Sequence, residues 1–543
     1  MSSEQPERRS EANITRRQML ARFGMIGGSS LMLTTMRAWD LIGQPAGPRP
    51  VISGDRANAR VVILGAGVSG LATALELTKR GYDVTVLEAR DRVGGLNWTI
   101  TRGTEHTELG EGGERQVCQF DEGMYLNAGP WRIPHDHHAV LGYAKELGVR
   151  MEQFIDDNVV MYNENPALGP LANKKVYLRE IVSDMWGHTT ELLAKAANQG
   201  AIDEALSADD KERLVQFLVR AGYLNNADQV YTPNARVRGN EDQYDLSTLL
   251  ASPFANQVRS INSGTGGPDP VFQPTGGMMQ IAIGFHRALG DIVQLGSPVE
   301  SVTQTADNVR VVYRDGRGGG RTEVTADYVV SCLPLAVLKT LEINLSPEMK
   351  VAVDASSHST SSKMGLQMKR RFWEEDDGIY GGHLTYTPYD PSAAQGAGGG
   401  GGGFGGGAGN PLPSFSYPSN DYHSPKGVLL GYYGNGTMVG IDGKPLIDVP
   451  VARRIEHVLS HASKVHPQIR DEYESAYAVW WPRVEYSLGA YAGNPGNRLE
   501  QLSKPDGRIY VGSAGVSSDP AWIEGAISSA WRTVEALHSR VMG

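Results

Sequence analysis

The chain has 543 residues, of which 40% are hydrophobic and 21% are charged, and its formal net charge is −10. This balance is that of a globular protein long enough for two or more cores, and the acidic charge argues against a nucleic-acid-binding surface. The two cysteines, Cys118 and Cys332, cannot form a disulfide framework. A single bridge between them stays open, although their apolar surroundings favour two buried thiols.

Residues 1–38 have a different character from the rest of the chain. Arg16 and Arg17 precede a weakly apolar segment that Gly27 and Gly28 interrupt, so this segment makes a poor membrane span. We interpret it as a twin-arginine export signal, a receptor-read address outside the fold. The mature protein is then expected to be periplasmic or extracellular, without a membrane anchor. A basic tail without signal function is the alternative.

Hydrophobic periodicity predicts the order of the elements. Strands are expected at 60–64 and 82–88, a helix at 68–80, and mostly helix over 130–250, most clearly at 137–149 and 208–224. Extended structure is expected over 292–330, with a hairpin-like turn at 314–321. A buried strand is expected from 328 to Pro334. Two further extended regions are expected, one that begins at Ser361 and one that precedes Tyr491. The chain ends with a strand and loop at 508–515 and a helix in 520–541, so strand–helix–strand units lie at both ends. This order predicts a cofactor domain built from distant pieces around an inserted substrate domain.

A glycine motif joins the first strand to the first helix. Gly65, Gly67 and Gly70 form G-x-G-x-x-G, in which the first glycine allows a tight turn and the second lets a pyrophosphate approach. The third packs the helix against the strand, and the phosphate lies at the helix N-terminus. Glu88 ends the next strand at the spacing of an acid that binds ribose hydroxyls. The motif, the helix and the acid together predict an adenine dinucleotide.

The run "LEARDRVGG", with Glu88, Arg90, Gly94 and Gly95, resembles the fingerprint of the flavin-dependent amine oxidase superfamily. Four further segments resemble that family in the expected order: "PTGGMMQIAIGFHRAL", "VVSCLPLAVL", "SSKMGLQMKRRFWEE" and "AWIEGAISSAW". The resemblance covers nearly the whole chain after the signal. Leu96 departs from it, because an arginine near the phosphates is common there, and "VGSAG" lacks the acid that often follows the late strand.

The resemblance implies an α/β fold: a Rossmann-like FAD-binding domain of the glutathione-reductase type, an inserted α+β substrate domain and a helical subdomain. The expected FAD-binding parts are 59–130, 266–345 and 491–543, the helical entrance region is 131–265, and the substrate domain is 346–490. The glycine-rich stretch 394–410 is predicted to be a flexible surface insertion.

The segment "FDEGMYLNAGPWRIPHDHH" resembles the part of L-amino-acid oxidases in which an arginine binds the substrate carboxylate, here Arg132. A guanidinium fork makes two charge-assisted bonds to a carboxylate. A structural salt bridge is the alternative. The resemblance implies that Lys363 holds a water near flavin N5, where a solvent-facing strand lysine is the alternative, and that Tyr491 and Trp522 wall the substrate.

Ala490 occupies a position where some amine oxidases carry a cysteine linked to the flavin, so non-covalent FAD is expected. The helix that begins near Trp522 would point its N-terminus at the flavin. By resemblance, the cofactor contacts are Gly65, Gly67, Gly70, Glu88, Arg90, Gly94, Gly95, Pro130, Trp131, Arg132, Val299, Gly512, Ser513, Trp522 and Ile523.

Other polar clusters are interpreted as structural. "HDHH" at 135–138 lacks the i, i+4 spacing of a metal site, so no metal is expected. The acidic run at 104–114 is expected to be a solvated loop.

The implied activity is oxidation of L-amino acids by FAD and oxygen to 2-oxo acids, ammonia and hydrogen peroxide, by a homodimer or larger homo-oligomer. L-Amino-acid 2-monooxygenase, monoamine or polyamine oxidase, and a non-catalytic flavoprotein are the alternatives.

Overall fold

A computed structural model of the chain describes Arg49 and residues 58–110, 113–199, 207–221, 224–233, 242–252, 254, 270–316, 318–389, 410–435 and 439–543. The predicted export signal lies outside the described residues, and so does the glycine-rich stretch except Asn410. Within the described residues, no helix is long and apolar enough to cross a membrane. Cys118 and Cys332 are buried and free, which confirms two thiols.

The described residues include a five-stranded parallel sheet in the order β12-β2-β1-β16-β25. In β1, Leu64 lies opposite Leu87 of β2 on one side and Ser331 of β16 on the other. The sheet joins stretches that are hundreds of residues apart in the chain. Its strands are β1 (Arg60–Leu64), β2 (Asp83–Leu87), β12 (Val293–Gln294), β16 (Tyr328–Ser331) and β25 (Ile509–Val511).

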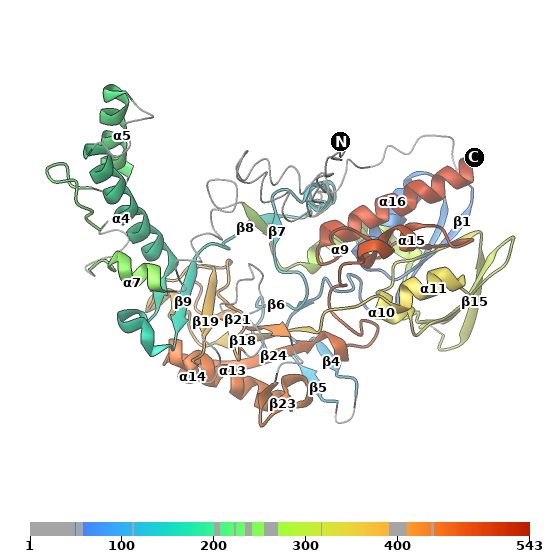
Figure 1. Ribbon diagram of the computed structural model, residues 1–543. Coiled ribbons are helices and arrows are strands. Elements are labelled where there is room, and N and C mark those ends of the chain that lie inside the picture. Colours follow the sequence, from blue (N-terminus) through green and yellow to red (C-terminus); the bar gives the residue numbers. More distant parts are fainter. Residues whose placement is uncertain are drawn as a thin grey trace, which may run out of the picture.

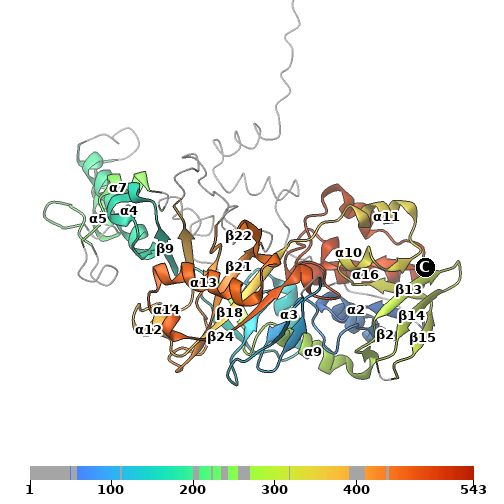
Figure 2. The same ribbon diagram turned by 90° about the horizontal axis from the view of Figure 1, so that it is seen from below.

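Alternate side chains of β1 enter two different cores, as the two-residue period of a strand dictates. Val61 and Ile63 pack against helices on one face, whereas Val62 and Leu64 pack against a β-layer on the other. Figure 2 shows α2, β2 and this β-layer close together at one end of the molecule. The helices are α2 (Val68–Lys79), α3 (His138–Glu146), α9 (Met279–Leu289) and α16 (Ile523–Met542), and the β-layer is β13 (Val299–Gln304), β14 (Val309–Arg314), β15 (Arg321–Ala326) and β17 (Glu342–Ile343).

A second, mixed sheet in the described chain has the order β10-β9-β19-β20-β21-β18-β24. Every residue of β18 (Ser361–Met368) is buried, because the strand lies between β21 and β24 and is covered on both faces. Met364 and Leu366 pack toward α13 (Val451–Val465), so Lys363 points to the opposite face. The remaining strands are β9 (Val159–Asn163), β10 (Val176–Tyr177), β19 (His383–Thr387), β20 (Phe415–Ser416), β21 (Gly427–Asn435) and β24 (Tyr473–Trp480).

The prediction of a mostly helical region over 130–250 is wrong in part. The described part of this region contains helices, but four short strands interrupt them. The strands form because partners far along the chain pair with them: β11 pairs with β7 and β8, and β19 pairs with β9. Figure 1 shows α4 and α5 projecting from the body of the molecule. Besides β9 and β10, the elements concerned are β7 (Ile133–Pro134), β8 (Met151–Phe154), β11 (Val271–Pro274), α4 (Leu178–Asn198), α5 (Ala208–Ala221) and α7 (Leu246–Ala251).

The predicted strand from 328 to Pro334 ends earlier, at Ser331, and a helical turn follows Pro334. Proline lacks the N–H that a continuing ladder would need. The hairpin predicted around 314–321 is confirmed by the antiparallel pair Arg314–Arg321. The shorter elements are β3 (Thr99–Ile100), β4 (Glu105–Thr107), β5 (Arg115–Val117), β6 (Leu126–Asn127), α10 (Leu335–Leu338), α11 (Pro347–Asp354), α12 (Phe372–Glu375), β22 (Val439–Ile441), β23 (Lys444–Pro445), α14 (Ile469–Glu472) and α15 (Leu499–Ser503).

We expect Gly70→Ala to lower the free energy of unfolding by about 1–3 kcal/mol, because its Cβ would overpack the turn. That Cβ would lie 2.0 Å from the carbonyl oxygen of Gly65. The matched control is Gly142→Ala in α3, where no described atom lies within 4 Å of the new Cβ. This control should be neutral or slightly stabilising. Urea denaturation of both variants measures the difference, and equal stabilities would contradict the close approach of α2 to the turn.

Candidate active site

A cavity of about 900 Å³ lies between the two sheets, at the carboxyl ends of the parallel strands. Gly65 follows β1, Glu88 follows β2 and Ser513 follows β25, and all three line the cavity. The second sheet contributes Lys363 of β18 and Tyr433 of β21. The volume of the cavity is near the upper end of the range for small-molecule pockets, which suits a cofactor together with a substrate.

The glycine turn after β1 forms a cradle in this cavity. Gly65 has a φ of +95°, a conformation that favours glycine. A Cβ on Gly67 would meet no described atom within 4 Å, so the backbone there is open to the cavity. α2 begins at the next residue. Its N-cap residue is Gly67, which has no side chain to accept from the first N–H groups of the helix. Because the first N–H groups of a helix have no intrahelical partner, this cradle fits a pyrophosphate.

Glu88 ties the turn to the segment that follows β2. Its Oε2 accepts the backbone N–H of Ala66 at 2.8 Å, and its Oε1 accepts the N–H of Arg90 at 3.0 Å. Arg90 in turn donates from Nη2 to Oγ of Ser487 at 2.8 Å. The glycine motif, the acid and the segment after Trp481 are therefore joined around one side of the cavity.

Two buried polar atoms at the cavity fit a bound polar group. Asn97 Nδ2 and Ser513 Oγ have no hydrogen-bond partner among the described residues, and both residues line the cavity. Leaving buried donors unpaired costs free energy, so a ligand that pairs with them is the expected occupant. Together with the glycine cradle, these atoms fit a cofactor that carries phosphate and other polar groups.

The structure brings together nearly all the residues that the sequence assigns to the site. Gly70 and Gly512 do not line the cavity: Gly70 packs against the carbonyl of Gly65, and the carbonyl of Gly512 accepts the hydroxyl of Ser69. The predicted residues that line the cavity are Gly65, Gly67, Glu88, Arg90, Gly94, Gly95, Pro130, Trp131, Arg132, Val299, Lys363, Tyr491, Ser513, Trp522 and Ile523.

Lys363 is buried, with 2% of its surface exposed, so the alternative of a solvent-facing lysine is wrong. Its Nζ donates to the carbonyls of Asn127 at 3.2 Å and Gly129 at 2.5 Å, and it lies 4.7 Å from the ring centroid of Tyr433. Burial lowers the pKa of Lys363 well below its ordinary value, and the charge of Arg132 lowers it further. The carbonyl bonds and the ring offset part of the desolvation cost.

Arg132 lines the cavity and makes an ion pair. Its Nε lies 3.2 Å from Oδ2 of Asp156, and its guanidinium carbon lies 5.6 Å from the ring centroid of Trp522 and 5.4 Å from that of Trp131. Burial lowers the pKa of Arg132, while Asp156 raises it. The salt bridge considered from the sequence is therefore present, and the same side chain lies at the cavity wall.

Several residues at the site were missed by the sequence analysis. Tyr433 lies directly opposite Lys363 because β18 and β21 pair in that register, for which the sequence carries no signal. His137 packs edge-on against Trp522, with ring centroids 4.9 Å apart, and burial lowers its pKa to about 4. Among the described residues, no three His, Cys, Asp or Glu side chains converge on a site for a metal ion.

The segment from Trp481 to Tyr491 lines the cavity and is bonded to neighbouring segments. Trp481 donates from Nε1 to the carbonyl of Ala128 at 2.8 Å. Tyr486 and Leu488 have φ values of 57° and 54°, which non-glycine residues adopt only where their surroundings enforce them. Strong anchoring of this segment is therefore required.

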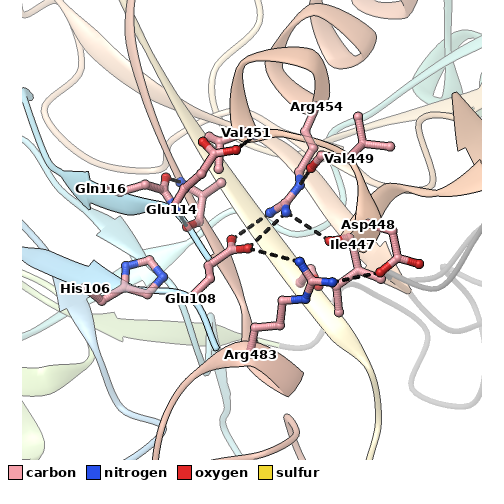
Figure 3. Close-up of polar contacts among 12 residues, drawn as sticks. His106, Glu108, Glu114, Gln116, Ile447, Asp448, Val449, Val451, Arg454 and Arg483 are labelled. Carbon is pink, nitrogen blue, oxygen red and sulfur yellow. Dashed lines mark hydrogen bonds and ion pairs between the residues drawn. The ribbon is translucent and has the colours of Figure 1, made fainter. Parts of the chain in front are cut away.

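Figure 3 shows the anchor: the carboxylate of Glu108 lies between the guanidinium groups of Arg454 and Arg483. Arg454 donates to both oxygens of Glu108, at 2.6 and 2.9 Å, and each of these two side chains is 2% exposed. Arg483 lies 3.8 Å from Glu108 and 2.7 Å from Asp448, and its carbonyl accepts the N–H of Leu109 at 2.8 Å. The expectation of a solvated acidic loop over 104–114 is therefore wrong at Glu108, since cations from distant segments bury it.

Comparison with known proteins identifies the family. Residues 68–538 match the sequence pattern of the family described as flavin containing amine oxidoreductase. The chain belongs to this family. The matched residues include every strand of both sheets except β1, and every described residue that lines the cavity except Gly65 and Gly67.

The relatives include an L-amino-acid oxidase of Notechis scutatus scutatus, 24% identical over 504 residues, which cover 86% of this chain and 84% of the relative. The flavin-dependent L-tryptophan oxidase RebO of Lentzea aerocolonigenes is 26% identical over 512 residues, covering 89% and 99%. A solved structure of putrescine oxidase with putrescine bound has a TM-score of 0.54 at 19% identity, covering 89% of this chain and 99% of that one. At this identity the structural likeness concerns the fold.

We expect Glu108→Gln to lower the free energy of unfolding by about 3–5 kcal/mol, because it leaves the buried guanidinium of Arg454 without its counter-charge. The matched control is Glu105→Gln, which removes an ion pair whose side chains are 62% and 56% exposed. An exposed pair contributes only about 0–1 kcal/mol. Urea denaturation compares the two variants, and a similar loss in both would contradict a special role for the buried cluster.

Acid should destabilise the protein through His106. Burial lowers its pKa to about 4 from an ordinary value of 6.5. Since the unfolded chain binds the proton first, the free energy of unfolding should fall between pH 6.5 and pH 4, with about 1–3 kcal/mol coming from this residue. Denaturation curves of His106→Phe should show a shallower fall over this range. The exposed His135→Phe serves as the control and should keep the wild-type slope.

Proposed function

We propose that the chain is an FAD-dependent oxidase that converts L-amino acids to 2-oxo acids with release of ammonia and hydrogen peroxide. The observation that carries the proposal is Arg132, a guanidinium at the wall of the same cavity as the glycine cradle and Lys363. A planar, permanently charged fork is suited to a carboxylate, which an amino acid has and a simple amine lacks. The names of the relatives with L-amino-acid and L-tryptophan oxidase activity support this choice.

The residues of this chain bind and orient the substrate. Arg132 holds the carboxylate, and Trp522 and Tyr491 confine the amine-bearing carbon and exclude water. The bound flavin would accept the substrate's two electrons and pass them to oxygen. Lys363 holds a water through Nζ, which also donates to the carbonyls of Asn127 and Gly129.

Non-covalent binding of FAD is part of the proposal. Ala490 lines the cavity at the position where a linking cysteine is expected in some family members. Cys332 also lines the cavity, but burial raises its pKa to about 11, which keeps it a thiol rather than a reactive thiolate. Ile523 begins α16 at the cavity, where the positive helix end favours negative charge on a bound group.

We also propose that residues 1–38 direct twin-arginine export, that the mature protein is a homo-oligomer, and that its cofactor domain comprises 59–130, 266–345 and 491–543. Paired arginines before a short apolar stretch support the export signal. The five strands of the parallel sheet come from the three stretches named, which supports the division of the cofactor domain. Signal removal is measured by N-terminal sequencing of the exported protein. Light scattering of the purified protein gives its oligomeric state.

An L-amino-acid 2-monooxygenase, which would give an amide, and an amine or polyamine oxidase are the enzymatic alternatives. The structural likeness to putrescine oxidase makes a polyamine oxidase a specific alternative, although that likeness concerns the fold. A cation without a carboxylate would meet the positive charge of Arg132, which disfavours plain diamines near it. Product analysis and substrate range separate all three.

We expect anaerobic addition of L-amino acids to bleach the flavin absorbance at about 450 nm, a property of the cofactor itself. Decarboxylated amines should not bleach it. Arg132→Ala should lower kcat/KM by about 100-fold, since a charged hydrogen-bonded pair contributes about 3 kcal/mol. The exposed Arg287→Ala is the matched control. Bleaching by amines that is unaffected by Arg132→Ala would move the protein to the amine oxidases, and an amide product would make it a monooxygenase.

A further inference from the structure

Asp156 and His383 lie behind Arg132, outside the set of residues that line the cavity. One oxygen of Asp156, Oδ2, lies 3.2 Å from Nε of Arg132, and the other, Oδ1, lies 2.7 Å from Nε2 of His383. Nδ1 of His383 lies 3.0 Å from Oγ of Ser416, its direct partner across β19 and β20. The carboxylate is therefore held from both sides and cannot rotate without losing one contact.

Packing fixes the same group. The rings of Trp131 and His383 have centroids 4.8 Å apart, and the ring of Phe154 lies 5.1 Å from that of Trp131. Trp131 precedes Arg132 in the chain, so the imidazole supports the backbone that carries the guanidinium as well as its counter-ion. His383 is 5% exposed and Ser416 is 1% exposed, which leaves this support little freedom.

The charge state of Asp156 suits this arrangement. Burial by itself raises its pKa, but the hydrogen bond from His383 and the charge of Arg132 bring the pKa below its ordinary value. The carboxylate thus stays ionised beside the guanidinium. An ion pair through Nε restricts rotation of the planar guanidinium, and a bidentate contact with a second carboxylate depends on the direction of that plane.

We infer that Asp156 and His383 are positioning residues that orient Arg132 toward the substrate carboxylate and so set the selectivity of the enzyme for amino acids over amines. The inference rests on the proposed function, in which Arg132 binds that carboxylate. In metal sites, residues that orient a ligating side chain change affinity by about 10- to 100-fold when they are replaced, and the same geometric argument applies to a guanidinium that must face a carboxylate.

The direction in which carboxylate binding changes distinguishes a positioning role of Asp156 from an effect of its charge alone. Asp156→Asn removes a negative charge next to Arg132, which by electrostatics alone would strengthen the binding of an anion. Loss of orientation weakens it instead. A purely structural role would change stability without changing the preference for carboxylates.

The experiment titrates the holoenzyme with benzoate, a carboxylate without an amine, and follows the flavin spectrum. It then measures kcat and KM for the best L-amino acid. We expect Asp156→Asn and His383→Phe, which keeps a ring against Trp131, to weaken benzoate binding about 10-fold or more. KM should rise by a similar factor, with a smaller change in kcat. Asp156→Glu should restore part of the affinity, and the exposed neighbour Asp157→Asn should behave as wild type.

Unchanged or tighter benzoate binding in Asp156→Asn, together with loss of binding in Arg132→Ala, would overturn the inference and leave the proposed function standing. If Arg132→Ala itself bound benzoate as wild type does, the proposed carboxylate contact would fail first. Should Asp156→Asn not fold with flavin bound, His383→Phe and Asp156→Glu decide: wild-type affinity in both overturns the inference, and weaker binding in His383→Phe supports it.

Discussion

β1 pairs in parallel with β2 on one side and with β16 on the other, and the position of the cavity depends on this pairing. Parallel strands present their carboxyl ends at one edge of a sheet, where ligands of open α/β sheets bind. The turn at Gly65, the carboxylate of Glu88 and the hydroxyl of Ser513 reach that edge from remote parts of the chain. Without this pairing, the glycine turn would not lie beside Glu88 and Ser513 at one edge of the sheet.

The opposite wall depends on strand register. β18 is buried along its whole length, and Lys363 faces the cavity because Met364 and Leu366 face the core beneath α13. A slip of one residue would exchange these faces and place a methionine at the cavity. The two carbonyls that accept from Nζ offset part of the cost of burying this lysine.

Buried charges at the site are matched by partners on other segments. Arg132 has Asp156, and Glu108 has Arg454 and Arg483, so the burial of these two charges is compensated by ion pairs. The second cluster lies outside the cavity but anchors the segment in which Tyr486 and Leu488 keep positive φ values. Local strain at the cavity wall is thus maintained by ion pairs in the surrounding structure.

The sequence by itself determined the strand at 60–64, the glycine turn, the helix after it and Glu88, because these follow from local periodicity and fixed spacing. It also singled out Arg132, Lys363, Tyr491 and Trp522 through segments that resemble the family, and all four line the cavity. It did not give the short strands within 130–250, since these strands exist only through pairing with distant partners.

Tertiary structure alone decided which side chains contact those residues. Asp156, His383 and Tyr433 carry no local signal, because their roles arise from register and packing between separate segments of the chain. The burial of Glu108 has the same origin, since its partners lie on α13 and after β24. Sequence spacing fixes contacts within a turn or helix, whereas contacts between layers require the folded chain.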